Sequence, residues 1–122
     1  MIKHISFSCL FLGALFVLSS PCYAQWQPDI RLTNDPAESR ISQNNARTVT
    51  AYGSLVFVVW MDHRSGYGEI YSKRSTDGGT TWEKDKRVTS NAGVSANPSV
   101  SISGSVLHLV WEEDRNGNNE IY

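Results

Sequence analysis

Apolar and polar residues in the middle of the chain follow the short-range pattern of antiparallel strands. Residues 47–52 alternate between polar and apolar side chains, Gly53-Ser54 is a tight-turn sequence, and residues 55–61 form an unbroken β-branched and aromatic run. A polar turn is expected over 62–68, a strand over 69–75, a turn at 77–79 and a strand over 80–89. The pattern predicts four antiparallel strands joined by short loops.

The chain repeats itself with a period of roughly fifty residues. Residues 53–62 match residues 104–113 at an offset of 51, and the match continues without a gap to Tyr71 and Tyr122. Residues 26–33 match residues 82–89 at an offset of 56, so the first copy has a longer connection (34–45) than the second (90–97). A continuous apolar strand needs burial on both faces, which a single four-stranded sheet cannot supply. The repeat therefore predicts sheets stacked on one another, as in the blades of a β-propeller.

The repeat register also predicts how the chain is organised. Residues 26–33 correspond to a fourth strand that lacks its three predecessors, and we expect them to act as an orphan closing strand. Residues 46–89 are expected to form the first blade and residues 96–122 a truncated second blade. On this interpretation residues 25–122 are the N-terminal fragment of a longer propeller, whose further strands follow Tyr122.

The N-terminus has the pattern of a secretory signal peptide. A basic start with Lys3 leads into an apolar run over 5–18 and a small-residue exit, and cleavage is expected after Ala24. The alternative is an uncleaved anchor, but the run is shorter than the ~20 residues that a spanning helix needs. Cleavage of residues 1–24 would remove Cys9 and Cys22 and leave no thiol for a disulfide or metal site. The expected location is secreted, periplasmic or cell-surface, without stable membrane insertion after cleavage.

Charge and metal-ligand spacing exclude several function classes. The chain has 11 basic and 12 acidic side chains and a net charge of -1, which argues against nucleic-acid binding. His63 and His108 lack metal-ligand spacing with other donors. Oxygen donors alternate from Asp114 to Glu120, but Gly117 does not sit at the sixth place of an EF-hand loop, so this segment is interpreted as a solvated turn. No cofactor and no metal are expected.

Residues 75–82 carry the most specific motif in the chain, Ser-Thr-Asp-Gly-Gly-Thr-Thr-Trp. An aspartate in such a turn can accept hydrogen bonds from backbone N–H groups of its own turn, and glycine permits a positive φ. The segment resembles the Asp-box, or bacterial neuraminidase repeat, whose pattern is Ser/Thr-x-Asp-x-Gly-x-Thr-Trp. The matching positions are Ser75, Asp77, Gly79, Thr81 and Trp82.

The flanking residues 59–71 also resemble blades of sialidase-like propeller proteins from secreted bacterial families. This resemblance implies an all-β, sialidase-like propeller of four-stranded blades. It also implies that the Asp-box lies on the face opposite the catalytic centre, which makes Asp77 a structural residue.

Repetition separates architectural residues from candidates for function, because a catalytic role is needed only once per molecule. The recurring pairs are expected to form ion pairs between strands or blades, or to pack between blades: Trp60/Trp111, Asp62/Glu113, Arg64/Arg115, Glu69/Glu120 and Tyr71/Tyr122. The residues found in one copy alone are the better functional candidates: Arg40, Arg47, His63, Tyr67, Asp114, Asn116, Asn118 and Asn119.

The resemblance implies a catalytic set of three arginines, a tyrosine nucleophile with its glutamate, and an aspartate acid/base. Arg40-Ile41-Ser42 matches two of three letters of the family's Arg-Ile-Pro motif. The candidate catalytic residues are Arg40, Arg47, Asp62 and Asp114, and the rest of the set would lie in further sequence.

Three functions remain open at this stage. The favoured one is a secreted Asp-box propeller that binds or scaffolds glycans or a cell-surface polysaccharide. The alternative is an exo-α-sialidase, a retaining glycoside hydrolase. A structural component of a surface array is the third, and the sequence leaves open whether the protein is an enzyme.

Overall fold

The computed structural model describes residues 5–7 and 24–122, and every regular element within them is a β-strand. Residues 1–4 and 8–23, most of the expected signal peptide, lie outside the described residues. The chain divides into two compact units, Met1–Leu32 and Thr33–Tyr122. The expected all-β class with antiparallel pairing is confirmed for the described part of the chain.

The first unit contains one pair of short strands. β1 (Ile5–Phe7) pairs antiparallel with β2 (Ala24–Trp26), and Ile5 lies opposite Trp26. Within residues 26–33, where a closing strand was expected, regular strand structure covers Trp26 alone, followed by an isolated bridge at Ile30.

The second unit contains two antiparallel sheets. The five-stranded sheet has the order β3-β5-β6-β7, with β4 also paired to β5, and the three-stranded sheet has the order β10-β9-β8. Since β6 runs along one edge of β5, β3 and β4 share the other edge. The strands of this unit are β3 (Ser39–Arg40), β4 (Val49–Tyr52), β5 (Leu55–Ser65), β6 (Tyr67–Ser75), β7 (Lys86–Arg87), β8 (Ser95–Ser103), β9 (Val106–Glu113) and β10 (Glu120–Ile121).

Two predicted elements are wrong in their extent. The polar turn expected over 62–68 is strand on both sides of Gly66. The chain reverses in a short turn in which the Gly66 N–H donates to the His63 carbonyl at 3.0 Å, and Gly66 adopts a φ of +97° that glycine permits. The strand expected over 80–89 is reduced to Lys86–Arg87. Residues 76–81 instead form bends and turns, because the side chains of the Asp-box hydrogen-bond this segment to itself.

The strand register shows where the two copies of the repeat differ in length. Ser39 pairs with Asp62, and Ser95 pairs with Glu113. Ser39 and Ser95 therefore occupy equivalent positions, and the repeat offset of 56 that relates residues 26–33 to residues 82–89 continues through β3. From Val49 onward the partners follow the offset of 51. The five extra residues therefore lie between β3 and β4, and the longer connection expected over 34–45 contains a strand. The second copy has only a local irregularity at the corresponding place in β8.

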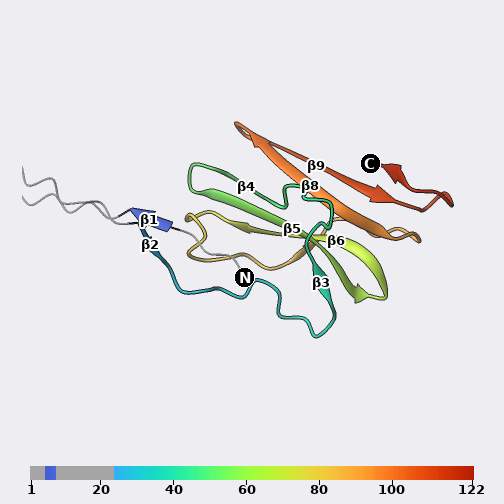
Figure 1. Cartoon of the computed structure of the whole chain (residues 1–122), viewed down its shortest axis with the longest axis horizontal. Coiled ribbons are helices and arrows are strands. Elements are labelled where there is room, and N and C mark those ends of the chain that lie inside the picture. Colours follow the sequence, from blue (N-terminus) through green and yellow to red (C-terminus); the bar gives the residue numbers. More distant parts are fainter. Residues whose placement is uncertain (1–4, 8–23) are drawn as a thin grey trace, which may run out of the picture. The chain divides into compact units, whose positions relative to one another are not determined.

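The two sheets of the second unit stack face to face. β8 packs against β4, β5 and β6, and Figure 1 shows β8 lying between these strands and β9. A Cβ atom on Gly68 would lie 3.1 Å from Cγ1 of Val94, next to β8, so the face of β6 that carries Gly68 and Ile70 points at the second sheet. Val59 and Ile70 on this face are completely buried. The tryptophan-bearing strands β5 and β9 thus belong to separate, neighbouring sheets.

Candidate functional site

A buried carboxylate lies at the end of β5, and the strand around it supplies its partners. Asp62 is 0% exposed, and its Oδ2 accepts hydrogen bonds from Trp60 Nε1 at 2.8 Å and from Ser39 Oγ at 2.9 Å. The Arg64 guanidinium donates to the same oxygen at 2.7 Å, and the Arg64 backbone N–H donates to Oδ1 at 3.0 Å. Both carboxylate oxygens are therefore occupied.

The arginine is in turn held by a ring and a second acid. The Arg64 guanidinium carbon lies 4.5 Å from the centroid of the Tyr71 ring, which stacks with Trp60 at 6.3 Å between centroids. Arg64 also donates to Oδ2 of Asp85 at 2.8 Å. Burial alone would raise the pKa of Asp62, but the hydrogen bonds from Arg64 and Trp60 outweigh it and hold that pKa far below its ordinary value.

The second sheet repeats the tryptophan, acid, arginine and tyrosine of this arrangement, whereas Ser95, at the position of Ser39, is buried with no hydrogen-bond partner for its hydroxyl. Glu113 is 1% exposed and accepts hydrogen bonds from Trp111 Nε1 and from the Arg115 guanidinium, each at 2.7 Å. The Arg115 guanidinium lies 3.9 Å from the Tyr122 ring centroid, and Trp111 stacks with Tyr122 at 6.3 Å. Burial works against the charge on Glu113, yet Arg115 and Trp111 lower its pKa. We call these two sets the acid clusters: Ser39, Trp60, Asp62, Arg64 and Tyr71 in the first sheet, and Ser95, Trp111, Glu113, Arg115 and Tyr122 in the second.

The acid clusters show how the recurring residues are used. Asp62 and Glu113 each form an ion pair with the arginine two residues later along the same chain segment. Arg64 also pairs with Asp85, and Glu69 on β6 pairs with Arg87 on β7, as expected for ion pairs between strands. Each tryptophan stacks on a tyrosine of its own sheet. The serine of each cluster is not among the predicted residues, although the repeat offset of 56, extended from residue 33 to residue 39, relates Ser39 to Ser95.

The Asp-box turn is closed by its own side chains. Ser75 Oγ accepts from the Gly79 N–H at 2.8 Å and donates to Asp77 Oδ1 at 2.8 Å. Asp77 also accepts from the backbone N–H of Thr81 at 2.8 Å and from its hydroxyl at 2.6 Å. These bonds, those from Thr81 first, lower the pKa of Asp77 to about 2. Trp82 Nε1 donates to the Gly79 carbonyl at 3.0 Å, so every Asp-box side chain acts within the turn.

The four candidate catalytic residues do not converge on a common site. Arg40 pairs in register with Met61 and so lies on the face of the sheet opposite to Asp62; it forms an ion pair with Glu38 at 2.8 Å. Arg47 is exposed, and its carbonyl accepts from the N–H of Val100 in β8. Asp62 is enclosed in its acid cluster. Asp114 uses Oδ1 to accept from the Val94 N–H at 2.6 Å.

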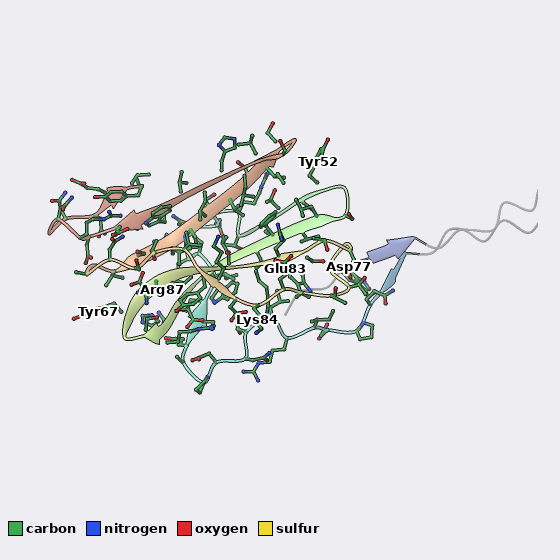
Figure 2. All side chains as sticks on the ribbon, turned by 180° about the vertical axis from the view of Figure 1, so that it is seen from behind. Tyr52, Tyr67, Asp77, Glu83, Lys84 and Arg87 are labelled. Atoms are coloured by element: carbon green, nitrogen blue, oxygen red, sulfur yellow. The ribbon has the colours of Figure 1, made fainter. Side chains whose placement is uncertain are left out.

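The non-repeated polar residues gather at the end of the sheets remote from the Asp-box. Figure 2 shows Tyr67 and Asp77 at opposite ends of the molecule's second unit, as expected for the two ends of β6. Tyr67 is 62% exposed at the β5–β6 turn, and the matching turn of the second sheet contains Asn116, Asn118 and Asn119, all exposed. We call these two turns, which carry Tyr67 and the three asparagines, the open turns. They offer a ring face and amide groups to solvent.

Neither a metal site nor a membrane-spanning helix is found in the described part of the chain. No group of three or more His, Cys, Asp or Glu side chains there is arranged to hold a metal ion. No helix among residues 5–7 and 24–122 is long and apolar enough to cross a bilayer. In the turn with alternating oxygen donors, Asn118 Nδ2 donates to Glu120 Oε1 at 3.4 Å.

Compared with known proteins, the chain matches no family model, and no curated protein or solved structure is similar enough to it to count as a match.

Proposed function

We propose that this chain forms two neighbouring blades of a secreted, sialidase-like Asp-box β-propeller that binds or scaffolds glycans and does not hydrolyse them. The stacking of two antiparallel sheets with equivalent registers supports the propeller part of the proposal. The Asp-box and the signal-peptide pattern in the sequence support its family and its export.

The observation that carries the non-catalytic role is that each buried carboxylate is held by a tryptophan and an arginine of its own cluster. A general acid that works near neutral pH needs a raised pKa and a proton within reach of a substrate. Asp62 and Glu113 have lowered pKa values, and their oxygens accept from tryptophan and arginine of the same cluster. The same set occurs in both sheets, as expected for a part of the architecture that each blade requires.

The open turns are the proposed glycan-binding surface. A tyrosine ring offers an apolar face and a hydroxyl, and asparagine amides offer both donors and acceptors to sugar hydroxyl groups. Loops at the end of a rigid sheet scaffold are common positions for binding residues. The opposite end of the sheets is less suited to glycan binding, because the polar side chains of the Asp-box there form hydrogen bonds within their own turn.

A glycan array probed with the purified protein tests the proposal, followed by titration of the best ligand. Tyr67→Ala should weaken binding about tenfold or more, because an exposed aromatic anchor is lost. Tyr52→Ala is the matched control, since Tyr52 is 61% exposed beside the β4–β5 turn at the Asp-box end and should not affect binding. Equal losses in both variants would contradict the assignment of the surface. Release of a fluorogenic sialoside by the purified protein would contradict the non-catalytic role and favour the exo-α-sialidase.

A further inference from the structure

The two arginines next to the open turns are bound to acids of the protein. Arg64 stands near the end of β5 and donates to Asp62 at 2.7 Å and to Asp85 at 2.8 Å. Arg115, at the matching position of the second copy, donates to Glu113 at 2.7 Å. Each guanidinium also lies over a tyrosine ring of its own acid cluster. The carboxylate of a ligand could therefore engage either arginine only by breaking contacts that the protein already makes.

A third arginine beside the first open turn is paired with a neighbouring glutamate. Arg40 Nη2 lies 2.8 Å from Glu38 Oε2, and their side chains are 45% and 56% exposed. The Glu38 carbonyl accepts from the His63 N–H at 3.1 Å, which attaches this pair to the turn that carries Tyr67. Arg47 lies farther along the sheet, where its carbonyl accepts a backbone N–H from the middle of β8. The charge of the arginine nearest to Tyr67 on this strand is thus balanced at the surface.

Apart from Arg115, the charged residues that flank the three asparagines are acidic. Asp114 stands two residues before Asn116, and its Oδ1 accepts a backbone N–H at 2.6 Å. Glu120 follows Asn119 directly and is exposed. Carboxylates are ionised at neutral pH, so the amide groups of the second open turn lie between two negative charges. A further carboxylate placed there by a ligand would be repelled.

We propose that the open turns bind uncharged sugars and discriminate against glycans that carry a carboxylate, such as uronic or sialic acids. The inference rests on the proposed glycan-binding role of the open turns and names the class of sugar. Recognition of a carboxylate favours a guanidinium that is free to make two parallel hydrogen bonds, and the arginines beside the open turns are held by acids of the protein. The Tyr67 ring and the asparagine amides suit the apolar face and the hydroxyl groups of a neutral sugar.

Titration with paired sugars tests the ligand class. The array should hold neutral hexose oligosaccharides beside their uronic acid counterparts of the same ring configuration, and the pair with the best neutral ligand is titrated. The neutral member should bind about tenfold or more tightly than the acidic one, because the carboxylate meets negative charge. Tyr67→Ala should weaken that binding, and added NaCl should not change it, because no ion pair forms with the ligand.

The outcomes separate this inference from the proposed function. Equal or tighter binding of the uronic acid, lost in Tyr67→Ala, would overturn the inference and leave glycan binding by the open turns in place. A steep loss of affinity for the best ligand with added NaCl would also overturn it. Absence of binding to every glycan on the array would overturn the proposed function and this inference with it.

Release of Arg40 from its pair tests the role of the acids. Glu38→Gln keeps the size of the side chain but removes the charge that holds Arg40. The variant should bind the uronic acid about two- to fivefold more tightly, the size of an exposed ion pair, with its affinity for the neutral sugar unchanged. Circular dichroism checks that the exposed substitution leaves the sheets intact.

Glu83→Gln is the matched control. Glu83 and Arg74 form a similarly exposed pair at 2.6 Å, and Figure 2 shows Glu83 on the side of the second unit where Asp77 lies, away from Tyr67. This variant releases an arginine far from the open turns and should leave both affinities unchanged. An unchanged affinity of Glu38→Gln for the uronic acid, or an equal gain in Glu83→Gln, would overturn the inference.

Discussion

The indole N–H of Trp60 donates to the carboxylate of Asp62, two residues further along the same strand, at 2.8 Å. Residues i and i+2 of a strand share one face, so the two side chains lie next to each other without a change of backbone direction. The same spacing recurs at Trp111 and Glu113, where the distance is 2.7 Å. Each sheet therefore buries one carboxylate with the indole N–H of a tryptophan fixed beside it.

Asp62→Asn should destabilise the protein strongly. The substitution keeps the size of the side chain but removes the charge that pairs with the half-buried Arg64. Removal of one partner of a buried ion pair costs about 3 kcal/mol or more, and urea unfolding should show a loss of this size. Glu38→Gln, in the exposed pair with Arg40, should change the free energy of unfolding by less than about 1 kcal/mol. A similar loss in both variants would contradict the structural role of the acid cluster.

Matched truncations in the two copies of the repeat should differ in their effect. Ile70→Ala removes a side chain that is 0% exposed and should cost about 2–5 kcal/mol. Ile121→Ala at the same repeat position removes one that is 72% exposed and should cost less than about 0.5 kcal/mol. Both are measured by chemical unfolding of dilute, monomeric protein. Equal costs would mean that the second sheet is covered in the monomer.

Ser75→Ala should open the Asp-box turn. The variant leaves the buried N–H of Gly79 without its acceptor, and an unsatisfied buried donor costs about 1–3 kcal/mol. Faster hydrogen exchange at Gly79 and Thr81 should accompany the loss. Ser103→Ala, at an exposed position on β8, serves as the control and should leave both quantities unchanged. Protection at Gly79 that persists in Ser75→Ala would contradict the assigned bond.

Acid should destabilise the fold through carboxylates whose pKa values are lower in the folded chain. The folded pKa of Asp77 is about 2, below the value of about 3.9 in an unfolded chain. The contribution of Asp77 is therefore complete above about pH 5 and is lost as the pH falls from about 4 to 2. Urea unfolding at a series of pH values should show a weaker acid dependence in Asp77→Asn over that range. An identical slope in variant and wild type would assign the acid sensitivity to other groups.

The strands and the repeat could be predicted from the sequence because they depend on local pattern. Apolar residues over 55–61 and turn residues at Gly53-Ser54 specify β5 and the turn before it, and the two offsets located the five-residue difference between the copies. Strand ends were less predictable. Asp62 and Arg64 are polar residues, which favoured a turn, but their mutual ion pair and Trp60 allow β5 to continue to Ser65.

The partners of the acids could not be derived from the repeat alone. Repetition showed that Asp62 and Arg64 recur, but recurrence alone does not tell whether they pair with each other within β5 or with residues of another strand. The seven-residue segment between Arg40 and Thr48 separates β3 from β4 along the same edge of β5. The repeat offset changes across this segment, so the offset of 51 does not relate Ser39 to Ser95. For Arg40, only the register shows that its side chain lies on the other face of the sheet from Asp62.

The charge state of the two buried acids tests the account most directly. ¹³C NMR can follow the side-chain carboxyl carbons of Asp62 and Glu113 as the pH is varied, with signals assigned through Asp62→Asn and Glu113→Gln. We expect both acids to remain ionised at neutral pH and to titrate below their ordinary values of about 3.9 and 4.3. Titration of either carboxyl between about pH 5 and 8 would be the behaviour of a catalytic acid and would contradict the structural role.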